Sequence, residues 1–549
     1  MKKLYVGALL CMGILSVQAQ QFVWAERGGS WAYDYGYGIT TDHDGNVYVA
    51  GKYEENAEFG PFTLPCQGNH DIFVTKYNSA GEVQWAASGG GPLGDYAHAM
   101  SCDGNYLYVA GEIEGANATI IFPGSPITLT SISDNDIFVC KYDLNGSLLW
   151  ARSAGGWKSE KALAVSSDNA GNVIIAGHYI DSCTFGGTTM INGNGIEDIF
   201  LAKYDANGNF LWVKGAGGPG RDEPKQVLCD ASGNIYMCGF FSPGATFEST
   251  AVNAPNGYYE TFVAKYDGNG NLSWVTTGGG DYDDVAWGMA MDNNGNLVVS
   301  GEFNASAYFG STQLITSGNA DVYVAAYNSS GNTLWAKKAG GPLIDRARGL
   351  GCDGNNIYIT GQFGASANFG SNNLNAADSS DIFFAALDNS GNFLSAYSAT
   401  GVADSLETLG YESGIAICAD PVGNVYATGS MLNGAVFGST SLEPYKRTDV
   451  FVTRIAEMTG TQERVAAGAE MRLYPNPTNG ELVFEPGEFT GRAVETRLYN
   501  NVGELIASSH TGSITRSRID LSDRPSGIYF VEIKSPGKQT YREKVVLNK

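Results

Sequence analysis

Acidic residues recur at one fixed distance before a turn throughout the first 460 residues of the chain. In each of seven places an Asp or Glu stands eight residues before the Asp that opens an Asx/Gly turn. These acids are Asp34, Asp95, Glu160, Asp222, Asp284, Asp345 and Glu412. Carboxylates gathered around one axis can bind a hard cation such as Ca²⁺ or a cationic ligand. The alternative is structural, because a carboxylate that accepts backbone N–H groups can hold one repeat against the next. A feature present in every repeat favours the structural interpretation.

Aromatic residues accompany these acids and suggest a second kind of site. They are Trp31, Tyr33, Tyr35, Tyr96, Trp157, Tyr282 and Trp287. Aromatic rings offer flat apolar faces on which a sugar ring can stack. Together with the acids, Trp31, Tyr96, Tyr282 and Trp287 therefore form the predicted ligand-binding set. Aromatic residues make up 12% of the chain, so composition alone also explains several of them.

Other patterns that could support chemistry are weak. The turns at Asp205, Asp267 and Asp292 resemble the start of a calcium loop but lack a Glu at the twelfth position, which favours plain hairpin turns. The five histidines show no metal-ligand spacing. No G-x-S-x-G element, P-loop or Cys/His pair is legible. No cofactor is firmly indicated, Ca²⁺ being the one cation considered, and no catalytic residue is assigned.

The elements that must position these residues come from an internal repeat of about 60 residues. Its most regular segment begins with Gly-Asn and ends with Gly. The copies are Gly45–Gly51, Gly104–Gly111, Gly171–Gly177, Gly233–Gly239, Gly295–Gly301, Gly354–Gly361 and Gly423–Gly429. Each unit holds four apolar or alternating segments separated by Asx/Gly turns, so each unit predicts four β-strands.

Four strands per unit, repeated seven times, predict an all-β, seven-bladed β-propeller. The chain begins with a lone strand, Gln21–Ala25, and its last unit lacks a fourth strand after Asp449–Ile455. The N-terminal strand should therefore complete the last blade and close the ring, which removes an open sheet edge. An open solenoid is the alternative.

The units also follow the pattern D..GN.Y..G…D.FV.KY…GN.LW, from Phe22 to about Glu457. In this the chain resembles the seven-bladed propeller repeats of secreted bacterial proteins. The resemblance implies the scaffold and says little of the ligand. The connections between second and third strands and between successive units are long and varied, as in residues 89–98, 215–225, 278–287 and 339–348. Ligand binding is expected on this elaborated face, where the seven acids should surround the mouth of a central channel.

The N-terminus has the pattern of a secretory signal peptide over residues 1–19. Lys2 and Lys3 precede an apolar stretch, and Val17-Gln18-Ala19 is a small-residue cleavage signal. A lipid anchor at Cys11 is the alternative. No later stretch is long and apolar enough to predict a transmembrane segment.

The C-terminal residues form a separate region. A small, polar linker over 458–471 precedes residues 472–549, whose short strands predict a small Ig-like β-sandwich. The segments YPNPTNG, LYNNVGEL and IDLSDRPSGIYFVEI, with the terminal Lys544-Val545-Val546, closely resemble the C-terminal sorting domain of type IX secretion cargo. The resemblance implies the type IX machinery as a partner, and a secreted or outer-surface protein of a diderm bacterium. Such tails are commonly cleaved.

Charge and cysteine content narrow the partners further. The net charge is −24, which argues against nucleic acid and anionic membranes. Cys102, Cys229, Cys352 and Cys418 occupy one equivalent position and are expected to be small buried residues. Cys229 and Cys238 could form a disulfide across a hairpin.

Taken together, these patterns predict a binding or adhesion protein whose ligand is a glycan or a protein. The alternative is a polysaccharide lyase or hydrolase that uses carboxylates and aromatics on the elaborated face. A cluster in which one repeat departs from the others would favour the enzyme. Arg221-Asp222-Glu223 and Asp345-Arg346 are the nearest candidates for such a cluster.

Overall fold

The computed structural model describes residues 22–458 and 472–547, except 255, 257, 378, 402–411, 421–422, 433, 457, 475–477, 479–480, 486–493, 501–504, 512–516 and 535–540. The expected signal peptide and nearly all of the expected linker lie outside these residues. The chain divides into two compact units, Met1–Gly460 and Thr461–Lys549. All regular elements of the described residues are β-strands, as the sequence predicts. Within those residues no helix is long and apolar enough to cross a membrane.

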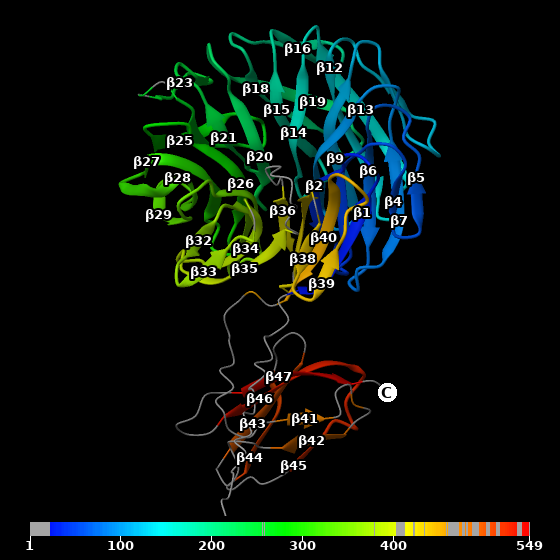
Figure 1. The fold of residues 1–549 in the computed structure, drawn as a ribbon, viewed down its shortest axis with the longest axis vertical. Coiled ribbons are helices and arrows are strands. Elements are labelled where there is room, and N and C mark those ends of the chain that lie inside the picture. Colours follow the sequence, from blue (N-terminus) through cyan, green and yellow to red (C-terminus); the bar gives the residue numbers. More distant parts are fainter. Residues whose placement is uncertain are drawn as a thin grey trace, which may run out of the picture. The chain divides into compact units, whose positions relative to one another are not determined.

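The first unit repeats one antiparallel group of four strands around a common centre (Figure 1). The first strand of each group lies innermost. The innermost strands are β2 (Tyr35–Thr41), β8 (Asp95–Cys102), β14 (Glu160–Ser167), β20 (Glu223–Cys229), β26 (Val285–Met291), β30 (Arg346–Cys352) and β36 (Ser413–Ala419). The second strands are β3 (Val47–Tyr53), β9 (Tyr106–Glu114), β15 (Val173–Tyr179), β21 (Ile235–Phe241), β27 (Leu297–Phe309), β31 (Asn356–Phe363) and β37 (Val425–Met431).

The remaining two strands of each group lie progressively further out. The third strands are β6 (Asp71–Tyr77), β12 (Asn135–Asp143), β18 (Asp198–Tyr204), β24 (Glu260–Tyr266), β28 (Thr312–Tyr327), β34 (Asp381–Asp388) and β40 (Asp449–Ile455). The outermost strands are β7 (Val83–Gly89), β13 (Leu148–Gly156), β19 (Phe210–Gly217), β25 (Leu272–Gly280), β29 (Thr333–Ala339), β35 (Phe393–Gly401) and β1 (Phe22–Gly29).

Burial and turn chemistry explain why each unit forms these strands. Every residue of β3, β15, β21 and β37 is buried, as expected for apolar strands covered on both faces. The predicted Asx turns close the hairpins. At the turn after β2, Asp42 Oδ1 accepts the N–H groups of Asp44 at 3.0 Å and of Asn46 at 2.9 Å.

The first strand of the chain pairs with the last strand of the repeat region, which confirms the predicted pairing. β1 is antiparallel to β40, with Ala25 opposite Thr453 and Gly28 opposite Val450. The innermost strands β2 and β36 are also in contact. Trp24 of β1 donates its indole N–H to the carbonyl of Ser79 at 3.0 Å. Trp85 does the same to Leu144 at 3.2 Å, so one tryptophan contact joins successive groups, including the last to the first.

Short hairpins join neighbouring groups as well, and these the sequence analysis did not predict. They are β4 (Ala57–Phe59) with β5 (Phe62–Leu64), β10 (Thr119–Ile121) with β11 (Thr128–Thr130), β16 (Ser182–Phe185) with β17 (Thr189–Asn192), β22 (Thr246–Phe247) with β23 (Thr250–Ala251), β32 (Ser366–Phe369) with β33 (Asn372–Asn375), and β38 (Ala435–Phe437) with β39 (Thr440–Leu442). Four of them extend the outermost strand of the preceding group, through the pairs β1–β4, β13–β16, β19–β22 and β35–β38. The long connections between second and third strands therefore help to hold neighbouring groups of strands together.

The cysteines differ from expectation in two respects. Cys229 lies opposite Ile235 and Cys238 opposite Gln226, so the strand register separates the two thiols that were expected to pair. Both are free, as are the other described cysteines. Cys102, Cys229, Cys352 and Cys418 are partly exposed rather than buried. Three of them, Cys102, Cys352 and Cys418, line a cavity of about 630 Å³ together with the turn acids, which explains their exposure.

The second unit contains two antiparallel sheets. One is β41 (Arg472–Tyr474), β42 (Glu481–Glu485) and β45 (Ser517–Asp520), and the other is β44 (Leu505–Thr511), β43 (Val494–Asn500), β46 (Gly527–Lys534) and β47 (Tyr541–Leu547). Leu482 from the first sheet and Leu498 and Val531 from the second belong to one hydrophobic cluster. The unit thus has a core of its own.

Candidate functional site

The seven repeated acids are buried, and at least the first six in chain order, from Asp34 to Asp345, accept backbone N–H groups. None is more than 2% exposed. Asp345 is typical: Oδ2 accepts the N–H of Gly341 at 2.7 Å, and Oδ1 accepts the N–H of Gly364 at 3.2 Å. Asp222 accepts the N–H groups of Gly218 and Ser242, both at 2.7 Å. Each pair of bonds ties the loop before an innermost strand to the end of a second strand, which favours the structural interpretation of these acids.

At least six of the repeated acids, again those from Asp34 to Asp345, also lie near another buried carboxyl group, which belongs to the preceding group of strands. A methyl group on Gly340 would lie 2.7 Å from Asp321 Oδ1 and 2.8 Å from Asp345 Oδ2, so both carboxylates approach one backbone position. Burial, reinforced by the facing charge of Glu260, raises the pKa of Asp284 to about 8, and burial raises that of Glu260 to about 8. It is costly for both groups to be ionised at once, so one or both are expected to carry a proton near neutral pH.

A different ring of side chains lines the central cavity, which has a volume of about 270 Å³. Each innermost strand contributes the residue that stands three positions after its repeated acid. These residues are Tyr37, His98, Leu163, Lys225, Trp287, Arg348 and Ile415. They are all different, although the positions around them repeat. Seven different side chains, one from each repeat, therefore line the same cavity.

One side of this cavity is cationic. Trp287 lies between Lys225, whose Nζ is 4.2 Å from the ring centroid, and Arg348, whose Cζ is 5.3 Å away. Burial lowers the pKa of Lys225 and of Arg348. Lys225 forms an ion pair with Glu223. The Nε of Arg348 and the Nε1 of Trp287 are buried and have no hydrogen-bond partner among the described residues.

The opposite side of the cavity is aromatic. Tyr35 and Tyr37 stack with ring centroids 5.8 Å apart, and Tyr96 and His98 stack at 5.5 Å. His98 Nε2 lies 3.1 Å from Oε1 of the buried Glu112. Burial would raise the pKa of Glu112, but the hydrogen bond with His98 and the charge of a nearby lysine lower it to about 2. Glu112 is therefore ionised and holds His98 in place.

The structure separates the aromatic residues that the sequence grouped together. Trp287 lines the cavity, and Tyr96 stacks on the lining residue His98. Trp31 is 62% exposed and Tyr282 is 50% exposed, and neither lines the cavity. Trp31 lies under the ammonium group of Lys446 at 5.9 Å, and Tyr282 packs against a neighbouring tyrosine at 5.2 Å.

Sequence reasoning missed Tyr37, His98, Lys225 and Arg348 as candidate residues. The signal that would have found them was disagreement between repeats rather than agreement. The residues immediately before this position are mostly small, namely Gly36, Ala97, Ala162, Pro224, Ala286, Ala347 and Gly414. A position whose residue type varies between repeats, and whose preceding residue is small in nearly every repeat, indicates a side chain that is not needed for packing of the strands.

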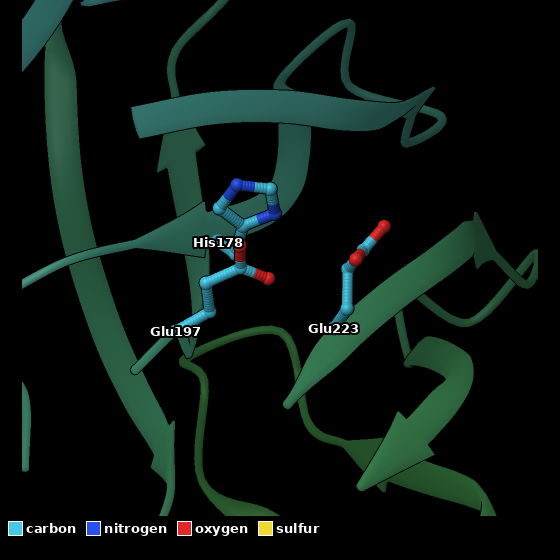
Figure 2. Close-up of side chains that lie close together, drawn as sticks. All are labelled: His178, Glu197 and Glu223. Carbon is cyan, nitrogen blue, oxygen red and sulfur yellow. The ribbon is translucent and has the colours of Figure 1, made fainter. Parts of the chain in front are cut away.

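A second cluster lies between neighbouring groups of strands, at the start of β20 (Figure 2). One ligand atom each from His178 of β15, Glu223 of β20 and Glu197, which precedes β18, lie within 4.8 Å of one another. The Nδ1 of His178 is buried and has no partner among the described residues. In number and type these residues suit a transition metal.

Ion pairs argue against a metal in this cluster. Arg221, a residue from the loop that the sequence singled out, pairs with Glu197 and, at 3.0 Å, with Glu223. Lys225 pairs with Glu223 as well. Two cations therefore already neutralise both carboxylates, and a divalent ion would have to displace them. Burial lowers the pKa of His178, which keeps the imidazole neutral near pH 7. The second sequence candidate, Arg346, forms an ion pair with Glu302.

The strands and the tail define a secreted protein built on propeller-type β-repeats. Residues 24–52 match the family described as β-propeller repeat, and residues 472–548 match the family described as secretion system C-terminal sorting domain. The chain is a β-propeller repeat protein with a type IX secretion sorting domain, and that domain directs it to the cell surface or the medium.

Curated relatives share the repeat region at low identity. An uncharacterized WD repeat-containing protein of Acanthamoeba polyphaga mimivirus is 25% identical over 442 residues, which cover 65% of this chain and 31% of the relative. The regulatory protein FlaEY of Caulobacter vibrioides is 23% identical over 268 residues, which cover 46% of this chain and 28% of the relative. The matched region thus spans about a third of the length of these relatives.

Solved structures resemble the chain only loosely. A puromycin hydrolase is 11% identical, with a TM-score of 0.36 over 83% of this chain and 59% of that chain. A glycoside hydrolase of family 32 from Bifidobacterium adolescentis is 9% identical, with a TM-score of 0.26 over 94% of this chain and 95% of that chain. At such scores the functions of these enzymes carry no argument for this chain.

Proposed function

We propose that the protein is a seven-bladed β-propeller that binds a glycan or protein ligand outside the cell. In this proposal the propeller spans residues 20–457, closed by the N-terminal strand. A linker over 458–471 joins it to an Ig-like sandwich over 472–549, the sorting domain. Contacts between consecutive innermost strands, from β2 through β36 and back to β2, support the ring.

The observation that carries the binding function is the ring of seven unlike side chains in the central cavity. At least six of the repeated acids accept backbone N–H groups and lie near a carboxyl group of the preceding group of strands, so they support the scaffold. The residues free to differ, such as Tyr37, Trp287 and Arg348, gather in one space on that scaffold. Ligand sites on repeat proteins are expected where a rigid frame presents variable side chains.

A polysaccharide-active enzyme is the second candidate, and the His178 cluster is the observation that favours it. A buried neutral imidazole beside two carboxylates could act as a general base, for example in a lyase. The carboxylates suit a general acid less well, because the charge of Lys225 prevails over burial and lowers the pKa of Glu223.

Binding and turnover can be separated with the purified mature protein. A glycan array and a panel of surface proteins should reveal retained ligands. The same polysaccharides should show no new reducing ends and no ultraviolet absorbance from unsaturated products. Turnover of any polymer would contradict the binding function and support the enzymatic one. If no ligand is retained in either panel, the proposed binding function is wrong.

A further inference from the structure

The central cavity combines positive charge with aromatic faces, although the whole chain is strongly acidic. Arg348 and Lys225 enter from neighbouring sides of Trp287, and Tyr37 and His98 lie across the cavity. The net charge of the chain is −24, so composition alone would predict an acidic pocket. Charges outside the cavity are screened over about 8 Å at physiological ionic strength, and the local groups therefore decide which ligand fits.

Arg348 supplies charge that the surrounding protein does not balance. Glu302 is the carboxylate whose charge acts on Arg348, and it already forms an ion pair with Arg346. Among the described residues no carboxylate forms an ion pair with Arg348. A guanidinium group stays protonated in proteins, so the cavity holds a positive charge that an anion could neutralise.

Two buried donors also lack acceptors in the described part of the chain. They are the Nε–H of Arg348 and the Nε1–H of Trp287. Buried donors are nearly always paired, and an unpaired donor in a cavity marks a place where a ligand atom would be held. The guanidinium fork and an indole N–H together suit the two oxygens of a carboxylate.

The rest of the cavity favours a sugar as the carrier of that carboxylate. The lining residues Tyr37 and His98 are aromatic, and each stacks on a second ring, that of Tyr35 or Tyr96. Leu163 and Ile415 add apolar lining. A volume of about 270 Å³ lies near the lower end of ligand pockets and admits one sugar residue rather than a length of chain.

We propose that this cavity binds the terminal uronic acid residue of an acidic glycan, with Arg348 and the indole N–H of Trp287 holding the carboxylate. The sugar ring lies against the aromatic side formed by Tyr37 and His98. This inference rests on the proposed binding function and names the ligand class for it.

Calorimetry on the full-length mature protein tests the inference with trigalacturonic acid as the probe. Its fully methyl-esterified form is the matched neutral probe, since it keeps the sugar rings and removes the charge. We expect the acid to bind at least tenfold more tightly than the ester. Arg348→Gln should lower the affinity for the acid about tenfold or more and leave the ester unchanged, because it removes a charge-assisted hydrogen bond.

Two further variants keep the test independent of folding. Trp287→Phe keeps an aromatic ring but removes the N–H donor together with part of the ring surface, so it should weaken binding of the acid a few-fold more than binding of the ester. Lys158→Gln removes an exposed cation of a loop that lines neither cavity, and it should bind both probes like the parent. Unchanged melting temperatures establish that each variant is folded.

The outcomes separate this inference from the proposed function. Equal binding of acid and ester, or an Arg348→Gln variant that binds the acid like the parent, overturns the uronate site and leaves glycan binding intact. A peptide with a free C-terminal carboxylate that binds more tightly than trigalacturonic acid overturns the choice of a sugar. If neither probe binds at millimolar concentration, the inference fails, and the glycan and protein panels then decide whether the proposed function fails with it.

Discussion

Asp34 and Asp449 approach the same backbone position, Gly29, although they come from opposite ends of the repeat region. A methyl group on Gly29 would lie 2.7 Å from Asp34 Oδ2 and 2.9 Å from Asp449 Oδ1. Asp34 also accepts the N–H of Glu54 at 2.9 Å, and Asp449 accepts the N–H of Tyr445 at 2.9 Å. The pair therefore joins the first repeat to the last, and similar pairs lie at five other junctions between repeats.

These carboxyl pairs predict that the repeat unit is more stable at pH 5 than at pH 8.5. Burial raises the pKa of Asp34 to about 7 and that of Asp95 and Asp284 to about 8, against about 4 in the unfolded chain. The folded state thus holds protons that the unfolded state releases. This stabilisation is complete below about pH 4 and is lost as the pH rises through about 7 to 8.

Thermal unfolding followed by circular dichroism between pH 5 and 9 measures this effect. We expect the melting temperature to fall by at least ~2 °C over this range. The pKa of turn acids such as Asp42 is lowered, so their contribution to stability changes only below about pH 4 and is constant between pH 5 and 9. A melting temperature that rises from pH 5 to pH 9 would contradict the raised pKa values of these buried carboxyl groups.

Asp284→Asn tests one carboxyl pair directly. Its Oδ1 accepts the N–H of Asn304 at 2.9 Å, and its Oδ2 is buried without a partner among the described residues, so an amide can replace the carboxyl and donate to Glu260. The variant should lose less stability between pH 5 and 8.5 than the parent, by on the order of 1 kcal/mol. Asp44→Asn, at an exposed turn position, is the control and should keep the parent's pH dependence.

Gly340 is predicted to be intolerant of any side chain. Its φ of +149° is accessible almost only to glycine, and a Cβ would contact the carboxylates of Asp321 and Asp345. Gly340→Ala should destabilise the protein by roughly 2–4 kcal/mol in chemical denaturation.

Gly187 supplies a comparison in which a positive φ is present and the neighbouring carboxylates are not. Gly187 also has a positive φ, of +73°, but no heavy atom lies within 4 Å of the added Cβ. Gly187→Ala should therefore cost only about 1 kcal/mol, the ordinary penalty of a left-handed alanine. Equal losses for the two variants would show that the carboxyl pair is not close-packed around Gly340.

The repeat explains both the success and the limits of sequence-based prediction for this chain. Strand type and the pairing of β1 with β40 could be predicted, because each repeat gives the same pattern and one terminus lacks a strand that the other supplies. The short hairpins between neighbouring groups, such as β4 with β5, could not, since two to four residues per strand leave no periodicity to recognise.

The candidate site could be predicted less well from the sequence, because the residues that recur at a fixed spacing support the scaffold, and the sequence does not show which of the variable positions share one space. Asp345 and its equivalents share a spacing because each must accept backbone N–H groups at a junction between repeats. Arg348 stands three residues further on, at a position that does not have to accept backbone N–H groups. The residue type at this position therefore varies from repeat to repeat. Only the structure shows that these variable positions, Arg348 and Tyr37 among them, meet in one cavity.

Trp24 is predicted to hold the terminal strand in place. β1 and β40 are not joined by a turn, so their pairing depends on hydrogen bonds and on side chains such as Trp24, which donates to Ser79. Trp24→Ala should accelerate amide hydrogen exchange in β1. Trp274→Ala removes the same contact within the array, where Trp274 donates to Ser329 at 3.1 Å, and should leave β1 protected. Equal protection of β1 in both variants would mean that the indole contact does not secure the strand.

The tail is predicted to be required for delivery to the cell surface but not for folding of the repeat unit. Residues 472–548 match the sorting domain, and the unit has a hydrophobic cluster of its own around Leu482, Leu498 and Val531. Deletion of Leu473–Lys549 should therefore leave a folded repeat unit in the periplasm, detected by protease protection of intact cells. Full-length protein carrying Arg348→Gln is the control and should still reach the surface, because its change lies in the cavity and not in the tail. A deleted protein that stays accessible to external protease would show that other residues direct export.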